Sequence, residues 1–133
     1  MKPYKLKWSG RKNAAEDYRR IDAQLEAIDL ARSESKIFRN YNQYLVTKAI
    51  MSVDIVGQPI DKSAISAVTK LSRSSVYNAI NKLERENLVT SFSMRMDNKR
   101  RYVEASIELT HHYLDFLDTV KSLQDLMEKH VAG

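Results

Sequence analysis

The stretch that decides the fold runs from Ile60 to Leu109 and reads IDKSAISAVTKLSRSSVYNAINKLERENLVTSFSMRMDNKRRYVEASIEL. Apolar residues recur in it at helical spacing in two groups: Ile65, Val68, Leu71, and then Val76, Ile80, Leu83. Either Asp61 or Ser63 can cap the first helix, and Ser72 can cap the second, because short polar side chains accept hydrogen bonds from free N–H groups. We therefore predict two helices joined by a tight turn.

The second of these helices has a polar face that combines hydrogen-bonding groups with cations. Its members are Arg73, Ser74, Tyr77, Asn78, Asn81 and Lys82. A carboxamide offers adenine a donor and an acceptor together, so Asn78 and Asn81 are the predicted base readers. Arg73 and Lys82 can reach either guanine or the phosphate backbone. The face is suited to a groove of double-stranded DNA.

A basic hairpin is predicted directly after the second helix, which should end near Asn87 because Asn tolerates the left-handed conformation. Two runs alternate in polarity with period two: Phe92, Met94, Met96, and then Val103, Ala105, Ile107, Leu109. Asp97 and Asn98 supply turn chemistry between them. Four cations cluster around this turn: Arg95, Lys99, Arg100 and Arg101. Such a loop is suited to phosphates or to a narrow minor groove.

These elements in this order predict a winged helix-turn-helix. Helix-turn-helix pairs also occur as plain packing units, and a basic hairpin tip is often only a solvated turn. The order of elements, the helix polarity and the charge agree, and this agreement favours nucleic-acid binding. The expected fold class is mainly α with a small β-hairpin, a winged helix-turn-helix with long N- and C-terminal flanking helices.

The charge is unevenly distributed along the 133 residues, whose net charge is +5. Residues 1–12 contain five basic residues and no acid, and residues 62–101 contain nine basic and three acidic residues. The rest of the chain holds eight basic and fourteen acidic residues. A polyanion would therefore be attracted to the predicted helix-turn-helix and hairpin and repelled by the flanking helices.

Length and composition predict one domain over residues 13–133, preceded by a basic, flexible arm over residues 1–12. No apolar run approaches membrane-spanning length, and no apolar signal core follows the basic start, so we expect a cytoplasmic protein without a membrane partner. The absence of Cys excludes disulfides and thiolate metal sites. The arm, which carries Trp8, is a DNA-contacting arm, a strap around a partner protomer or a solubilising tail.

The flanking segments, residues 13–54 and 110–130, are predicted to be helical dimerisation ends. Residues 13–31 form one amphipathic helix, and Ser33 can cap another that ends near Asp54. The C-terminal helix has an apolar stripe wide enough to contact both its own domain and a second copy, which favours dimerisation over a helix that wraps only its own core. The predicted dimer contacts are Ile21, Leu25, Phe116, Val120, Leu123 and Met127.

Nothing in the sequence indicates an enzyme, a metal site or a cofactor. Adjacent residues His111 and His112 point to different sides of a helix, and His130 is not at ligand spacing from either. The three glycines form no phosphate-binding loop, and no Ser lies near a His in a nucleophile motif. Tyr41, Tyr44, Tyr113 and Met51 either line a ligand pocket or fill a core, and their helical spacing favours a core.

From about Asn13 to His130 the order of elements resembles the MarR family of bacterial and archaeal transcription regulators. The best-matching block is LSRSSVYNAINKLERENLV, residues 71–89, followed by the wing and by Ile107-Glu108-Leu109-Thr110. The resemblance implies that residues 72–86 are the recognition helix, residues 94–101 the wing tip and the terminal helices an obligate dimer interface. It also implies a possible small-molecule effector, since some members bind small aromatic ligands.

The chain departs from the family pattern at three places. Asn87 and Lys70 stand where glycine is common, and the wing reads Asp97-Asn98-Lys99-Arg100-Arg101, so the wing arginine is either Arg100 or Arg101. We expect a homodimeric, sequence-specific DNA-binding transcriptional regulator that reads a palindrome. The alternative is a winged helix used for assembly, as in a replication or phage accessory module, with the wing and Tyr77 contacting a protein partner. RNA binding has only Phe92 in its support.

Overall fold

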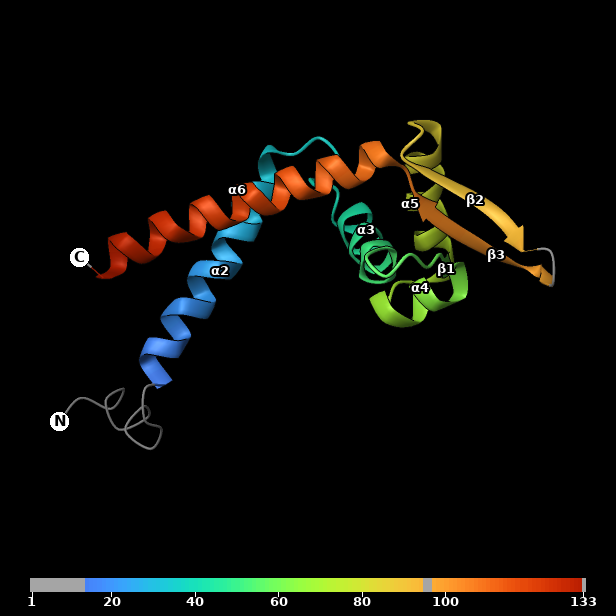
Figure 1. Cartoon of the computed structure of the whole chain (residues 1–133). Helices are drawn as coiled ribbons and strands as arrows, with labels where there is room; N and C mark the ends of the chain where they lie inside the picture. Colours follow the sequence, from blue (N-terminus) through green and yellow to red (C-terminus); the bar gives the residue numbers. More distant parts are fainter. Residues whose placement is uncertain (1–13, 95–96, 133) are drawn as a thin grey trace. The chain divides into compact units, whose positions relative to one another are not determined.

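The computed structural model describes residues 14–94 and 97–132. Its elements are α2 (Ala14–Glu34), α3 (Tyr41–Asp54), β1 (Ile60–Asp61), α4 (Lys62–Thr69), α5 (Arg73–Arg85), β2 (Val89–Met94), β3 (Asp97–Ala105) and α6 (Ile107–Ala132) (Figure 1). They form two compact units, one with α2 and the part of α6 from Phe116, the other spanning Glu34–Asp115. The fold is mainly helical with a small antiparallel sheet, which confirms the predicted class.

The helix-turn-helix lies in the second unit and is formed by α4 and α5. Asp61 is the N-cap of α4, and its Oδ1 accepts a hydrogen bond from the Ser63 N–H at 2.8 Å. Ser72 is the N-cap of α5, and its Oγ accepts from the Ser75 N–H at 3.2 Å. Between the helices Lys70 adopts the left-handed conformation, with φ of 64°. Of the two candidate caps for the first helix, the structure selects Asp61.

The core of this unit is built around the apolar stripe of α5. Its buried residues are Val76, Ala79, Ile80 and Leu83, as the helical spacing predicts. In α4 only Ile65 is fully buried, and Val68, predicted on the same apolar face, is 64% exposed. The prediction for Val68 was therefore wrong, and α4 ends at Thr69, before Leu71.

The sheet has three antiparallel strands in the order β1-β3-β2. β1 pairs Ile60 with Val103, a two-residue strand too short to show any period in the sequence. The β2–β3 hairpin extends away from α3, α4 and α5 (Figure 1). A register shift follows Ser93, so that Met94 pairs with Asp97.

Three predicted boundaries are corrected by hydrogen bonding that the sequence pattern did not show. Asp97 and Asn98 belong to β3 and not to the turn, because Met94 pairs with Asp97 after the register shift. The predicted second strand ends at Ala105, and α6 begins at Ile107, because Ser106 Oγ accepts from the Leu109 N–H at 3.1 Å.

The third correction concerns the start of α3. Ser33 lies within α2, where its Oγ donates to the Leu30 carbonyl at 2.7 Å, and therefore caps no helix. Asn40 is the N-cap of α3, with its Oδ1 accepting from the Gln43 N–H at 3.1 Å. The segment between Glu34 and Asn40 is a turn.

The first unit contains α2, whose buried face differs from the predicted one. Its buried residues are Ala23, Ala27 and Ala31, at steps of four. The predicted apolar stripe is largely exposed, with Ile21 at 57% and Leu25 at 56%. Alanine side chains let a helix pack more closely than larger side chains do. The larger side chains of α2 remain uncovered in the single chain. Within the described residues, no helix is both long and apolar enough to cross a membrane.

Candidate nucleic-acid interface

The polar face predicted for the second helix exists on α5. Its six residues are all exposed, on the side away from the buried stripe: Arg73, Ser74, Tyr77, Asn78, Asn81 and Lys82. The helix that carries them is fixed at its start by the Ser72 cap and along its length by its buried residues. Helical spacing places Asn78 and Asn81 side by side at the centre of this face. A rigid helix thus presents these donors and acceptors together.

Two basic residues that the sequence prediction missed adjoin this face. Arg85 is exposed and lies four residues after Asn81, hence on the same stripe of α5. Lys62, in the first turn of α4, places its Nζ 5.4 Å from the centroid of the Tyr77 ring. A cation over an aromatic ring restrains both side chains. Helical spacing alone predicts Arg85, whereas Lys62 meets Tyr77 only through the packing of two helices.

The base of the wing is tied to α5 and α4. Ser91 of β2 donates to Glu84 of α5 through their side chains. Arg100 Nε lies 3.9 Å from Asp61 Oδ2, the same carboxylate that caps α4. Arg101 donates to Ser93 Oγ across the hairpin at 3.1 Å. The carboxylate of Asp61 therefore caps α4 and also pairs with Arg100 of the wing strand β3.

The structure describes the side chains of two of the four cations predicted for the wing. Arg100 and Arg101 are both exposed and both lie in β3. Arg95 lies outside the described residues, and Lys99 belongs to β3 with its side chain also outside them. DNA contact by these four cations stays a prediction.

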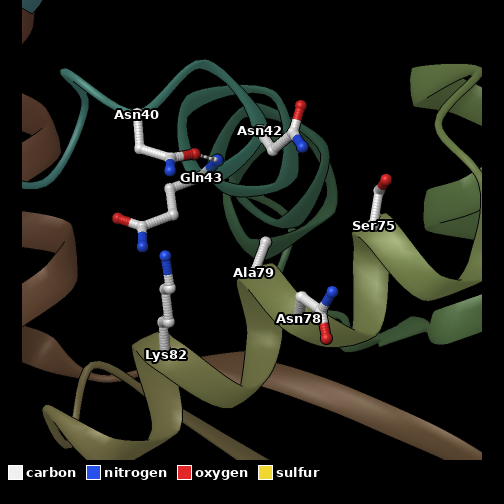
Figure 2. A pocket seen from close by; sticks show the side chains of 7 residues that line it. All are labelled: Asn40, Asn42, Gln43, Ser75, Asn78, Ala79 and Lys82. Carbon is white, nitrogen blue, oxygen red and sulfur yellow. Dashed lines mark hydrogen bonds between the residues drawn. The ribbon is translucent and has the colours of Figure 1, made fainter.

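A polar pocket lies on the flank of α5 that faces α3. Residues from the start of α3 and from α5 line it: Asn40, Asn42, Gln43, Ser75, Asn78, Ala79 and Lys82 (Figure 2). Its volume is about 200 Å³. The predicted reading residues Asn78 and Lys82 therefore border a recess as well as the open face of α5.

The tyrosines named as core or ligand wall belong to an aromatic cluster in the second unit. Phe38 meets Tyr44 edge-on at 6.4 Å and Tyr113 at 5.9 Å between ring centroids. Tyr44 is buried and Met51 is half-buried. Tyr41 is exposed, and its ring is tilted relative to the neighbouring ring of Tyr44. Burial raises the pKa of the Tyr113 hydroxyl. The packing favours a core role for Tyr44.

The six predicted dimer contacts fall into two groups. Ile21 and Leu25 are exposed on α2, where a second copy is able to cover them. Phe116 and Val120 are 6% and 8% exposed, so the single chain already buries them, and Leu123 and Met127 of α6 are half-buried. Other large apolar side chains of α2 and α6 are also exposed, although the site prediction omitted them: Tyr18, Leu30, Ile107, Leu114, Leu117 and Leu126.

The histidines give no sign of a metal centre. His111 and His112 are exposed neighbours on α6, and the side chain of His130 lies outside the described residues. Among the residues whose side chains are described, His, Cys, Asp and Glu form no group of three that would hold a metal ion.

No protein-family model matches the chain, and no curated protein sequence matches it. Solved structures do. A MepR variant from S. aureus bound to an oligodeoxyribonucleotide is 15% identical over 92% of this chain and 83% of its own, with a TM-score of 0.64. NadR in complex with 4-hydroxyphenylacetate is 15% identical over 92% and 82%, with a TM-score of 0.66. BpsR from Bordetella bronchiseptica is 11% identical over 88% and 84%, with a TM-score of 0.59.

These similar structures are MarR-family transcriptional regulators. The chain therefore has the MarR-like winged-helix fold, and the resemblance predicted from residues 71–89 is confirmed at the level of the fold.

Proposed function

We propose that the chain is a cytoplasmic, sequence-specific DNA-binding transcriptional regulator that acts as a homodimer on a palindromic site. The observation that carries this proposal is the exposed face of α5, where two carboxamides, a tyrosine and cations share one rigid helix. Carboxamides and cations are the groups that read base edges in the major groove. One such helix with about 13 residues fits that groove.

The wing supports the proposal by its charge. Arg100 and Arg101 extend the basic surface beyond α5, on a hairpin fixed to the reading unit through Asp61 and Glu84. A backbone contact of this kind sets orientation while the helix reads sequence. The similar MepR structure was solved with an oligodeoxyribonucleotide, which agrees with this use of the fold.

The homodimer is supported by the uncovered apolar side chains of α2 and α6. Ile21, Leu25 and Leu126 are each more than half exposed in the single chain. Ile21 and Leu25 lie four residues apart, hence on the same stripe of α2, and exposed apolar patches mark interaction sites in soluble proteins. A two-fold dimer would present two copies of α5 to half-sites about one helical turn apart, as a palindrome requires.

A small-molecule effector is a further element of the proposal. The DNA binding of BpsR is regulated by 6-hydroxynicotinic acid, and NadR was solved in complex with 4-hydroxyphenylacetate. Both compounds are hydroxylated aromatic acids. Melting the protein with and without such acids tests this element, because a ligand of the folded state raises the melting temperature. No shift with any of them would remove this chemical class.

The main test is selection of a preferred duplex, followed by binding titrations with that duplex and with random DNA. Asn81→Ala should weaken the selected duplex by about 1–3 kcal/mol and leave random DNA nearly unaffected, because a base contact carries sequence information. Ser63→Ala, at an exposed position of α4, is the control. Wild-type protein that binds random and selected duplexes equally, or neither, would refute the proposal.

A further inference from the structure

The pocket between α3 and α5 has a chemical character of its own. Carboxamides approach from both sides, and the methyl group of Ala79 lies between them (Figure 2). Lys82 is the one cation among the lining residues, and none of them is acidic. The side chains of Gln43 and Lys82 point toward each other from opposite walls (Figure 2). The pocket is therefore rich in donors and free of negative charge.

Four of the side chains that line the pocket form no hydrogen bond or ion pair with any described residue. Asn42, Gln43, Asn78 and Lys82 have no hydrogen-bond or ion-pair partner for their side chains in the part of the chain that the structure describes. An ammonium group has three donors and a carboxamide has two. Several unused donors that line one recess favour a ligand group with several acceptor oxygens and a negative charge.

The size of the pocket fits a phosphodiester group. Its volume of about 200 Å³ compares with the ~30 Å³ that one water molecule occupies in the liquid. The space is therefore large enough for a phosphate group, its ester oxygens and bridging waters. We propose that this pocket seats a backbone phosphate of the DNA that α5 enters, an inference that rests on the function proposed above.

The geometry of a groove-bound helix supports this seat. A helix with its side chains is about 10–12 Å wide, and the major groove is about 12 Å wide, so both flanks of the helix lie against the phosphate strands. Lys82 and Ser75 lie on the flank of α5 toward α3, next to Gln43. Tyr77, with Lys62 over its ring, follows Ser75 by two residues and therefore lies on a different side of α5. A phosphate on the α3 flank would meet the pocket.

This assignment decides the role of Lys82, for which the sequence left guanine and backbone open. Lys82 becomes a backbone-positioning residue, and Asn42 and Gln43, which the sequence analysis did not name, join the interface. The Asn40 cap bonds the backbone N–H of Gln43 and not its side chain, so the Gln43 carboxamide remains available.

The test measures binding of random and selected duplexes across a range of salt concentrations. Lys82→Gln should weaken both duplexes about tenfold and lower the slope of log affinity against log salt by about one. Gln43→Ala should weaken both a few fold without changing the slope, because the carboxamide is neutral. The control Lys121→Gln removes the same charge from an exposed position on α6 and should leave the slope unchanged.

A double variant and a modified duplex sharpen the result. The losses from Lys82→Gln and Gln43→Ala should be less than additive if both contact one phosphate. One neutral methylphosphonate, moved stepwise along the duplex, should weaken wild type at a position where it no longer weakens Lys82→Gln. Melting curves check that both variants fold.

Specific results would overturn the seat while leaving the proposed function intact. Loss of affinity only for the selected duplex in Lys82→Gln would make Lys82 a base reader. Behaviour of Lys82→Gln and Gln43→Ala like that of Lys121→Gln would remove the pocket from the interface. Failure of wild type to bind any duplex would instead refute the proposed function, and the seat with it.

Discussion

In the turn between α4 and α5, Lys70 adopts a backbone conformation that is unfavourable for a residue with a Cβ. A substitution by glycine should remove this cost in free energy. Lys70 has φ of 64° and ψ of 12°, in the left-handed region. For a residue with a Cβ this conformation costs roughly 1–2 kcal/mol, and glycine avoids the cost. Glycine loses about 0.5–1 kcal/mol through its freer unfolded chain. Lys70→Gly should therefore raise the free energy of unfolding by about 0.5–1 kcal/mol.

The same physics predicts the opposite sign at Gly57. Gly57 has φ of 74°, and a Cβ added there would meet no atom within 4 Å. The cost of Gly57→Ala is therefore one of backbone conformation alone, about 0.5–1 kcal/mol of lost stability. Lys70→Ala is the matched control, because it removes the exposed lysine side chain while keeping the strained conformation. It should change stability by less than about 0.5 kcal/mol.

Thermal and urea unfolding without DNA measure these differences. A gain of about 0.5–1 kcal/mol corresponds to a melting temperature about 2–4 °C higher in a chain of this size. Lys70→Gly and Gly57→Ala should move the transition in opposite directions, with Lys70→Ala close to wild type. A destabilised Lys70→Gly, or one that matches Lys70→Ala, would refute the argument from the left-handed conformation.

Three further predictions concern the wing, the dimer and pH. Arg100→Glu with Arg101→Glu should weaken random and selected duplexes alike and lower the salt slope by about one per lost phosphate contact; an unchanged slope would remove the wing from the interface. Leu25→Asp should lower the mass seen by light scattering while helicity survives, and a monomeric wild type would contradict this prediction. Val120→Asp should instead lower the free energy of unfolding by about 3–5 kcal/mol, because it buries a charge. Because burial raises the pKa of Tyr113 above 10.0, this group affects stability little below pH 10 and lowers it as pH rises further; Tyr113→Phe should flatten that fall, and equal falls would contradict it.

The second unit was largely predictable because its signals are local. A helix cap such as Ser72 bonds an N–H three residues away, and a C-terminal residue such as Asn87, with φ of 60°, closes its helix with neighbours in sequence. The stripe of α5 likewise needs only helical spacing to be recognised. For this reason the helix-turn-helix and its polar face follow from the sequence.

The boundaries that the sequence missed depended on competition between local signals. Ser33 and Asn40 are both good N-caps, and only the structure shows that the chain turns before Asn40. The alternation predicts a strand that continues past Ala105, whereas Ser106 caps a helix that begins at Ile107. Period two and period 3.6 share positions over so short a run, so periodicity alone does not separate them.

The sequence by itself determined the two helices, the Ser72 cap of the second helix and the cations on its polar face, because each depends on residues within a few positions of one another. Only the tertiary structure decided which face of α2 is buried, since apolar character marks Ile21 and Leu25 as strongly as it marks any core residue, whereas packing selected the alanines. It alone brought Gln43 beside Lys82 and Lys62 beside Tyr77. Such pairs come from separate elements, and their proximity follows from how those elements pack, which no local pattern encodes.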